Sequence, residues 1–356
     1  MPADTTAALV ISLDFELHWG VHDKWSAEGY RRNLLGARAA VPAMLALFRE
    51  FAVHATWATV GLLFFESKRE LLAGLPSRRP AYTRGELSPY GLLSSLGESE
   101  ADDPFHFAPS LIRCIAETPH QEIGTHTFSH YYCLEAGQTP GDFRADLEAA
   151  TAVMRRKIGR APRSIVFPRN QTTAACIAEC GALGLTAYRG NQPSWIYRER
   201  PDGDESLLRR GIRLADAYLP LSGGNAARID PASGAAATDV PASRYLRPYA
   251  PALRRLEPLR LRRITTDLTD AATSGRTYHL WWHPHDFGGH LHENLRVLRR
   301  ILICFDRLRE RYGMESRTME EAANPGRTAR SSAARESTVI YMRTRGHGAP
   351  SAALHS

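Results

Sequence analysis

The sequence has few cysteines and no long apolar run. Its 356 residues include five cysteines, an odd number whose only close pair is Cys176 and Cys180. This count argues against a disulfide framework or a four-cysteine zinc site and favours reduced thiols. No run of 18 apolar residues occurs, so we predict no membrane span. Because the N-terminus has no basic region and no apolar core of useful length, we predict no secretory signal and a cytoplasmic location.

Positive charge is in moderate excess. Lys and Arg number 45 against 38 Asp and Glu, which gives a net charge of +7. An anionic partner such as a phosphate-bearing substrate would suit this excess, although a genome that uses arginine freely explains it equally well. The arginines are scattered and no nucleic-acid-binding motif is present, so we predict no nucleic-acid partner. The sequence leaves the oligomeric state unknown.

Strand and helix patterns alternate along most of the chain. An apolar run over 7–13 predicts a buried strand, 34–53 has helical periodicity, and 54–64 predicts a second strand. Chemically unusual residues stand where predicted strands end, at Asp14, His126, Arg169 and His283. Parallel-strand barrels gather functional residues at the carboxyl ends of their strands, so an α/β barrel would bring these four segments together.

We predict one domain over 1–323 with two insertions. The first, near 67–109, is rich in Pro, Gly and Ser and is expected to be an ordered lid or substrate wall. The second, near 222–243, is dominated by Gly, Ala and Pro and is expected to be a long loop or a poorly ordered insertion. From 324 to 356 the chain is rich in Arg, Ser and Ala without an apolar period, which predicts a disordered tail.

Two histidines four residues apart form the first candidate site. In the segment EIGTHTFSH, one helical turn would separate His126 from His130, so both rings could point the same way. Two histidines on a solvated turn are the alternative. The segment SLDFE offers Asp14 and Glu16 directly after a buried strand, one as a general base and the other as a metal ligand. Two imidazoles and a carboxylate form a set that holds zinc or another divalent ion.

Two further segments carry candidate side chains. In FPRNQ, Arg169 follows a strand and could hold a carboxylate by a bidentate pair. In LWWHPHDFGGH, the two tryptophans could form the floor of a sugar pocket, and a histidine there could act as a general acid. The candidates for this acid are His283 and His285.

Together these motifs resemble the polysaccharide deacetylase family, the carbohydrate esterases with NodB homology. The resemblance consists of an acidic strand end, an H-[ST]-x-x-H box, an Arg after a strand and a late His, in that order, over about 9–313. It implies a distorted (β/α)7 barrel. The family commonly has adjacent Asp-Asp, whereas Phe15 here separates Asp14 from Glu16, so either carboxylate could ligate the metal.

The resemblance also implies a mechanism. A divalent metal, zinc in the first instance, would be held by His126, His130 and a carboxylate from Asp14 or Glu16. It would polarise the acetamide carbonyl of an N-acetyl sugar and activate a water molecule. Asp14, oriented by Arg169, would take the proton of that water, and His283, preferred over His285, would protonate the leaving amine.

The substrate implied is a carbohydrate in surface polysaccharide or glycoconjugate assembly. Without an export signal, the enzyme would meet nucleotide-linked or lipid-linked sugars. Two alternatives stay open at this point. One is an amide hydrolase of the same superfamily that acts on a formyl amide or a cyclic ureide, and the other is a carbohydrate-binding member without catalytic activity.

Overall fold

The fold is built around one sheet of parallel strands. The computed structural model describes residues 6–198, 200–201, 206–232 and 236–324. Within them the strands are β1 (Ala8–Phe15), β2 (Ala55–Thr59), β3 (Gln121–Thr125), β4 (Ser164–Ile165), β5 (Ala187–Tyr188), β6 (Thr238–Asp239), β7 (Arg244–Tyr245), β8 (Thr277–Trp282) and β9 (Glu315–Arg317).

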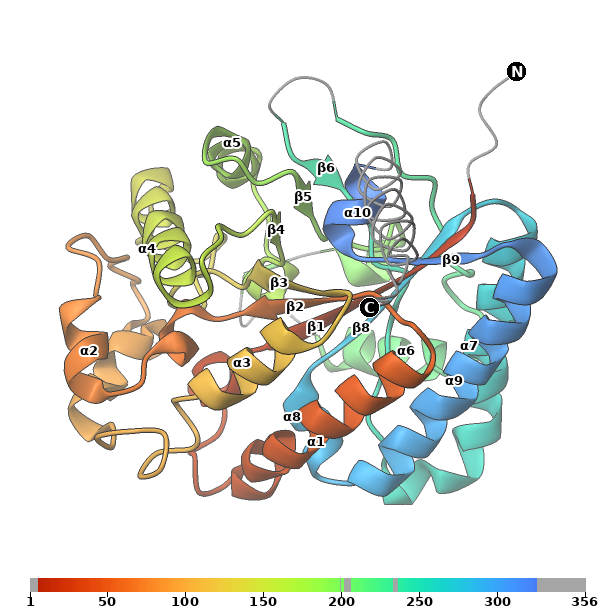
Figure 1. Cartoon of the computed structure of the whole chain (residues 1–356), viewed down its shortest axis with the longest axis horizontal. Coiled ribbons are helices and arrows are strands. Elements are labelled where there is room, and N and C mark those ends of the chain that lie inside the picture. Colours follow the sequence, from red (N-terminus) through yellow and green to blue (C-terminus); the bar gives the residue numbers. More distant parts are fainter. Residues whose placement is uncertain (1–5, 199, 202–205, 233–235, 325–356) are drawn as a thin grey trace, which may run out of the picture. The chain divides into compact units, whose positions relative to one another are not determined.

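The sheet curls so that its two ends approach each other. The strand order is β6-β5-β4-β3-β2-β1-β8-β7, and β9 pairs with the start of β1. Strands β6 and β7 stand at opposite ends of this order, yet only residues 240–243 separate them in the chain. Such a link spans at most roughly 18 Å. The sheet is therefore a distorted, incompletely hydrogen-bonded barrel (Figure 1).

Ten α-helices accompany the strands in the described residues. They are α1 (Arg31–Glu50), α2 (Lys68–Ala73), α3 (Pro109–Glu117), α4 (Pro140–Ile158), α5 (Ala174–Ala182), α6 (Leu207–Asp216), α7 (Glu257–Thr273), α8 (Pro284–Gly288), α9 (Leu291–Tyr312) and α10 (Met319–Ala323). Short 3-10 helices lie at Leu17–Gly20, Gly61–Phe64, Gly85–Leu87, Pro89–Ser95, Pro168–Asn170, Trp195–Tyr197 and Pro251–Leu256.

The main core lies between the central strands and one group of helices. Every residue of β1 is buried, because parallel strands of this kind are covered on both faces. Leu9, Ile11, Leu13 and Phe15 of β1 belong to one cluster with apolar side chains of α1, α3, α7 and α9, which lie together below the sheet in Figure 1. A second, smaller cluster joins α4 and α5 to β4. Helix α4 begins with a capping box between Thr139 and Asp142 and ends at Gly159 with a φ of 72°.

The α/β barrel predicted from the sequence is confirmed. The described residues form nine strands where the resemblance implied about seven, and four of the nine are only two residues long. The excursion over 67–109 contains α2 and two 3-10 helices, and the described part of 222–243 contains β6. The predicted tail lies outside the described residues from 325 onwards. All five cysteines are free. No helix among the described residues is long and apolar enough to cross a membrane.

Candidate active site

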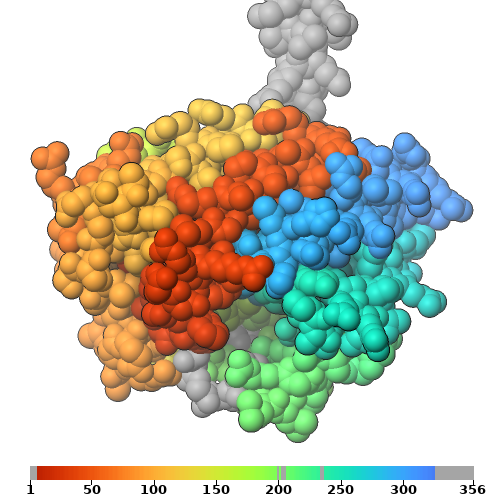
Figure 2. Space-filling view, turned by 90° about the horizontal axis from the view of Figure 1, so that it is seen from below, coloured from red at the N-terminus to blue at the C-terminus, as the bar shows by residue number. Residues whose placement is uncertain are grey.

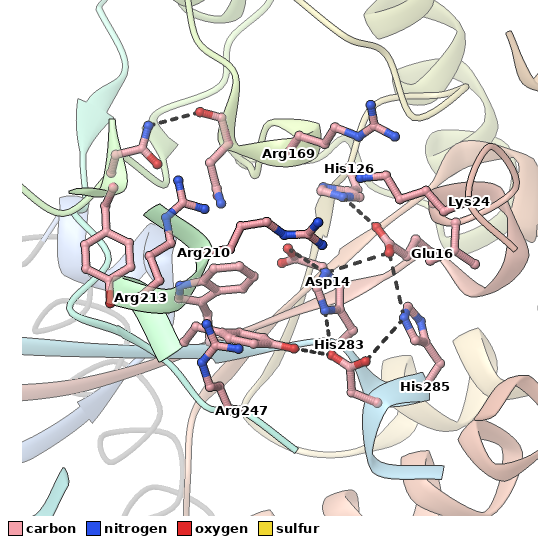
Figure 3. Close-up of a pocket in the computed structure, with 18 of the residues that line it drawn as sticks. Asp14, Glu16, Lys24, His126, Arg169, Arg210, Arg213, Arg247, His283 and His285 are labelled. Carbon is pink, nitrogen blue, oxygen red and sulfur yellow. Dashed lines mark hydrogen bonds and ion pairs between the residues drawn. The ribbon is translucent and has the colours of Figure 1, made fainter. Parts of the chain in front are cut away.

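The chemically unusual residues meet at the carboxyl ends of β1, β3 and β8, which belong to a run of four adjacent strands. Asp14 is the penultimate residue of β1 and Glu16 follows its end, while His126 follows β3 and His283 follows β8. Strand β1 pairs with β2 and β8, and β2 pairs with β3. Because all these pairs are parallel, the ends of the strands lie at one edge of the sheet. Figure 3 shows the side chains directed toward one another at this edge.

Three side chains converge on one point. Glu16 Oε2 lies 3.1 Å from His126 Nε2 and 2.9 Å from His130 Nε2. All three residues are buried. With metal–ligand bonds of about 2.1 Å, neighbouring donor atoms in tetrahedral or octahedral sites lie roughly 3.0–3.4 Å apart. The spacing of this group therefore suits a single divalent ion.

The protonation states of the two histidines also suit a cation. His126 Nδ1 lies 2.8 Å from the Val166 carbonyl, which can only accept, so Nδ1 carries the proton. With the proton on Nδ1, the Nε2 lone pair faces a carboxylate oxygen, and these two atoms repel unless a cation lies between them. Burial lowers the pKa of His130 to about 4, and Glu16 offsets only part of that effect, so His130 is neutral at pH 7. The residues thus fit a divalent metal ion.

The segment that carries the two histidines is a loop, so the predicted helical turn is wrong. Residues 126–132 follow β3 without helical structure, and the backbone has positive φ at Thr127 (65°) and His130 (58°). Buried Asp146 of α4 holds the loop, because its carboxylate accepts hydrogen bonds from the Phe128 and Ser129 backbone amides at 2.6 and 3.1 Å. The two rings converge through this local backbone geometry and not through helical spacing.

Asp14 is paired with an arginine other than the one predicted. Arg189, directly after β5, donates two hydrogen bonds of 2.7 Å to the two carboxylate oxygens of Asp14. Burial alone would raise the pKa of Asp14, but Arg189, together with His126 and His283, outweighs burial and holds the pKa below its usual value. Asp14 is therefore an ionised carboxylate outside the group around Glu16. The prediction that Arg169 orients Asp14 is corrected to Arg189.

Arg169 is turned away from Asp14 by its backbone. Both Arg169 and Asn170 have positive φ, 54° and 52°, where the chain turns after β4. The Arg169 guanidinium pairs with Asp23 and lies 4.3 Å from the centre of the Tyr132 ring. Arg169 still lines the cavity described below, and Asn170 accepts a 2.9 Å hydrogen bond from Arg189.

A double-mutant cycle would separate the two arginines. Arg189→Met leaves the Asp14 charge buried without its partner, so we expect the free energy of unfolding to fall by about 3–5 kcal/mol. In the Asp14→Asn background the same change should cost less, with a coupling energy of about 1–3 kcal/mol. Urea unfolding measures both quantities. Arg169→Met is the matched control and should show additive effects with Asp14→Asn; coupling of Asp14 to Arg169 instead would contradict the assignment.

A buried chain of hydrogen bonds runs from Arg189 through Ser12 to His279. Arg189 donates to Ser12 Oγ at 3.0 Å, and Ser12 Oγ lies 2.8 Å from His279 Nε2. His279 Nδ1 lies 3.0 Å from the Val240 carbonyl, which fixes the proton on Nδ1. The Ser12 hydroxyl can then donate to Nε2 while it accepts from Arg189. Burial lowers the pKa of His279 to about 3.

His279 should make the fold sensitive to acid. The folded protein keeps this imidazole neutral, whereas the unfolded chain binds a proton below its ordinary pKa of 6.5. Stability is therefore lost as the pH falls from 6.5 toward 3. Between pH 7 and pH 5 this residue alone should account for about 2 kcal/mol of the loss. Urea unfolding of His279→Gln should show a correspondingly shallower dependence, while His292→Gln, at an exposed position of α9, should keep the wild-type slope.

The late histidines form a second cluster with Asp286. His283 Nδ1 lies 2.8 Å from Asp286 Oδ2, and its Nε2 faces Glu16 Oε1 at 3.7 Å and Asp14 Oδ2 at 3.8 Å. Burial alone would lower the pKa of His283, but the carboxylates of Glu16 and Asp286 outweigh it and raise the pKa to about 10. Burial lowers the pKa of His285, which stacks on His283 with 5.1 Å between ring centres. His283 is thus the protonated member of the pair.

Close packing of α1 against α8 fixes these histidines. A Cβ atom at Gly36 would lie 2.4 Å from the Gly288 Cα, so the two helices meet backbone to backbone. Tyr30 donates a 3.2 Å hydrogen bond to Asp286 Oδ1, and Asn33 donates to the His285 carbonyl at the same distance. The N-terminal part of the chain therefore positions the late histidine motif.

A cavity of about 550 Å³ opens beside the cluster. Segments near 20–30, 197–198, 200–201, 209–217 and 244–247 contribute to its lining. Figure 2 shows the corresponding red, green and teal segments around a hollow on this face of the molecule. The two tryptophans of the late motif separate here: Trp281 lines the cavity, whereas Trp282 is fully buried and stacks on Phe287. The predicted aromatic floor is therefore reduced to Trp281.

Sequence reasoning missed Arg189 and Asp286. Arg189 stands directly after β5 and Arg169 stands a few residues after β4, so a position after a strand does not by itself show which arginine reaches Asp14. Asp286 lies three residues after His283, a spacing that allows contact within one turn. The structure brings together Asp14, Glu16, His126, His130, His283 and His285, and leaves Arg169 on the cavity wall.

Comparisons with known proteins agree with the fold. Residues 29–188, which include both histidines of the box but end before Arg189, match the family model described as polysaccharide deacetylase. The fold is similar to that of a provisionally named polysaccharide deacetylase from Mycobacterium smegmatis, with a TM-score of 0.57 and 15% identity over 93% of each chain. It is also similar to a second provisionally named polysaccharide deacetylase, from Pseudomonas aeruginosa PAO1, with a TM-score of 0.51 and 13% identity over 91% of this chain and 92% of the other. No curated protein matches the sequence.

Proposed function

We propose that this chain, whose residues 29–188 match the polysaccharide deacetylase family model, is a metal-dependent hydrolase that removes an N-acetyl group from an amino sugar. We place it in the cytoplasm, where its substrate would be a nucleotide- or lipid-linked precursor of a surface polysaccharide or glycoconjugate. One observation carries the proposal: the convergence of Glu16, His126 and His130 beside an ionised Asp14.

The ligand set supports the metal dependence. Glu16, His126 and His130 would hold the ion, and two imidazoles with one carboxylate leave positions open on a zinc ion. When bound, a divalent ion polarises an amide carbonyl and makes a water molecule a stronger acid. Gly20 leaves room for the carboxylate, since a Cβ atom there would lie 2.0 Å from Glu16 Cδ.

Asp14 would be the general base. Its carboxylate is ionised and held by two hydrogen bonds from Arg189, so it can accept the proton of the attacking water in a fixed orientation. The oxygen of this water adds to the acetyl carbon. Because Asp14 is bonded to Arg189 while Glu16 faces the histidines, the two carboxylates are free for separate roles.

His283 would be the general acid. Its pKa of about 10 keeps it protonated at neutral pH, and Asp286 fixes the orientation of the ring through Nδ1. Nε2 is then the atom that donates the proton to the leaving nitrogen as the carbon–nitrogen bond breaks. The products are acetate and a free amino sugar. The presence of a base, an acid and a full ligand set favours an enzyme over a carbohydrate-binding protein without activity.

A product assay tests this function. Purified protein loaded with zinc should release acetate from at least one member of a panel of N-acetylated sugar nucleotides, sugar phosphates and oligosaccharides. A chelator should abolish the release and added zinc should restore it. Formate released from N-formyl sugars, with no acetate from the panel, would move the protein to the related class of amide hydrolases. Failure of the protein to bind any divalent metal would reject the proposal.

A further inference from the structure

The cavity beside the candidate active site is lined by an excess of positive charge. Among the described residues, nine lining side chains are Arg or Lys and three are carboxylates. The three carboxylates, Asp14, Glu16 and Asp286, already face Arg189 or the histidines of the site. A cleft lined by one sign of charge focuses the electrostatic potential and attracts ligands of the opposite sign.

Some of these arginines have structural partners. Arg244 is buried and pairs with Asp267 at 2.9 Å, and Arg209 donates to the backbone carbonyls of Trp195, Ile196 and Arg198. Their guanidinium groups hold the loop before α6 and the region around α7. They are therefore explained by the fold and are left out of the argument that follows.

Two other arginines have no such explanation. Arg210 lies on α6, and Arg247 follows β7. Within the described part of the chain, no carboxylate lies at ion-pair distance from either guanidinium; Arg247 instead lies 5.7 Å from the centre of the Tyr245 ring. Arg213, three residues after Arg210, shares its side of α6 and also lines the cavity, although its Nε donates a 2.7 Å hydrogen bond to the Ile196 carbonyl. Figure 3 shows these three arginines on one side of the site, with Arg210 directed toward Asp14.

We infer that Arg210 and Arg247, with Arg213 adding positive charge beside them, bind a phosphate or diphosphate group carried by the substrate, next to the sugar whose amide is cleaved. The inference rests on the proposed function and assigns the residues that recognise the phosphorylated part of its substrate, which a neutral finished polymer lacks. Guanidinium groups bind phosphate oxygens by paired, charge-assisted hydrogen bonds, and two of them match the charge of a diphosphate diester. Without an anion, the charges of Arg210 and Arg247 would lie in the cleft with no carboxylate at ion-pair distance among the described residues.

Matched substrates test the inference. We expect kcat/KM for acetate release to be at least about 100-fold higher for N-acetylglucosamine 1-phosphate or its nucleotide diphosphate than for N-acetylglucosamine or chitotetraose. Two or three charge-assisted hydrogen bonds to the phosphate would supply a gain of this size. In the double variant Arg210→Gln/Arg247→Gln this ratio should fall at least tenfold. Arg296→Gln, at an exposed position of α9 outside the cavity, is the matched control and should keep the wild-type ratio. A nucleotide diphosphate sugar and a polyprenyl diphosphate sugar, assayed side by side, distinguish the soluble from the lipid source of the phosphate.

Binding of inorganic diphosphate separates this inference from the proposed function. Calorimetry should detect binding to the wild-type protein and to Arg296→Gln, and at least tenfold weaker binding to the double variant. Deacetylation of neutral and phosphorylated sugars at equal kcat/KM would overturn the phosphate site and leave the deacetylase. Loss of diphosphate binding in the double variant, with no acetate released from any sugar, would keep the phosphate site and reject the deacetylase. Equal diphosphate binding by the wild type and the double variant would overturn the inference.

Discussion

Glu16→Gln is expected to remove both the metal and the activity, whereas Asp14→Asn is expected to remove the activity alone. Both changes replace a carboxylate by an amide of the same shape. Glu16 faces His126 and His130 at 3.1 and 2.9 Å, so its amide would lose the charge that balances a divalent ion. Asp14 bonds to Arg189 instead, so its amide would spare the ligands and lose the base. Acetate release should fall at least about a thousandfold in both variants.

Metal content distinguishes the two variants. Elemental analysis should find about one zinc per chain in the wild type and in Asp14→Asn, and much less in Glu16→Gln. Added zinc should raise the thermal unfolding midpoint of the first two proteins and not of the third, since only a protein that binds the ion is stabilised by it. This second readout also shows that each variant is folded. Zinc retained by Glu16→Gln and lost by Asp14→Asn would reverse the two roles.

His283→Gln is expected to lower kcat by about 100- to 1,000-fold, whereas His285→Gln should lower it less than tenfold. The difference follows from protonation. The carboxylates of Glu16 and Asp286 keep His283 protonated, while burial favours the neutral form of His285. Only a protonated imidazole can donate to the leaving nitrogen, and such proton transfer contributes about 10²–10⁴ to enzymatic rates.

A leaving-group comparison makes this test specific. An amide whose leaving amine is only weakly basic needs little protonation of that amine. His283→Gln should therefore cleave such an amide nearly as well as the wild type does. The same substrate should not rescue Asp14→Asn, which lacks the base. If His285→Gln shows the larger loss and is rescued by this substrate, the acid is His285 and the assignment from the pKa values is wrong.

The sequence determined the resemblance to a family, the fold class and most of the candidate site. An apolar run that ends in acidic residues, a histidine pair after a strand and a late histidine are local patterns, and each marks the carboxyl end of a strand. Parallel strands place those ends at one edge of the sheet, so the residues that follow the strands identify the site. For this reason the sequence alone pointed to Asp14, Glu16, His126, His130 and His283.

Only the tertiary structure decided which partner each side chain has. Arg169 and Arg189 both follow strands, but the left-handed backbone at Arg169 directs its side chain to Asp23 and leaves Asp14 to Arg189. The histidines of the box converge through a loop held by Asp146, although their spacing suggested a helix. Such choices depend on backbone torsions and on contacts between residues more than a hundred positions apart, such as Glu16 with His126 and Asp14 with Arg189. A linear pattern records which residues reach an edge of the sheet, whereas packing fixes the direction in which each one points.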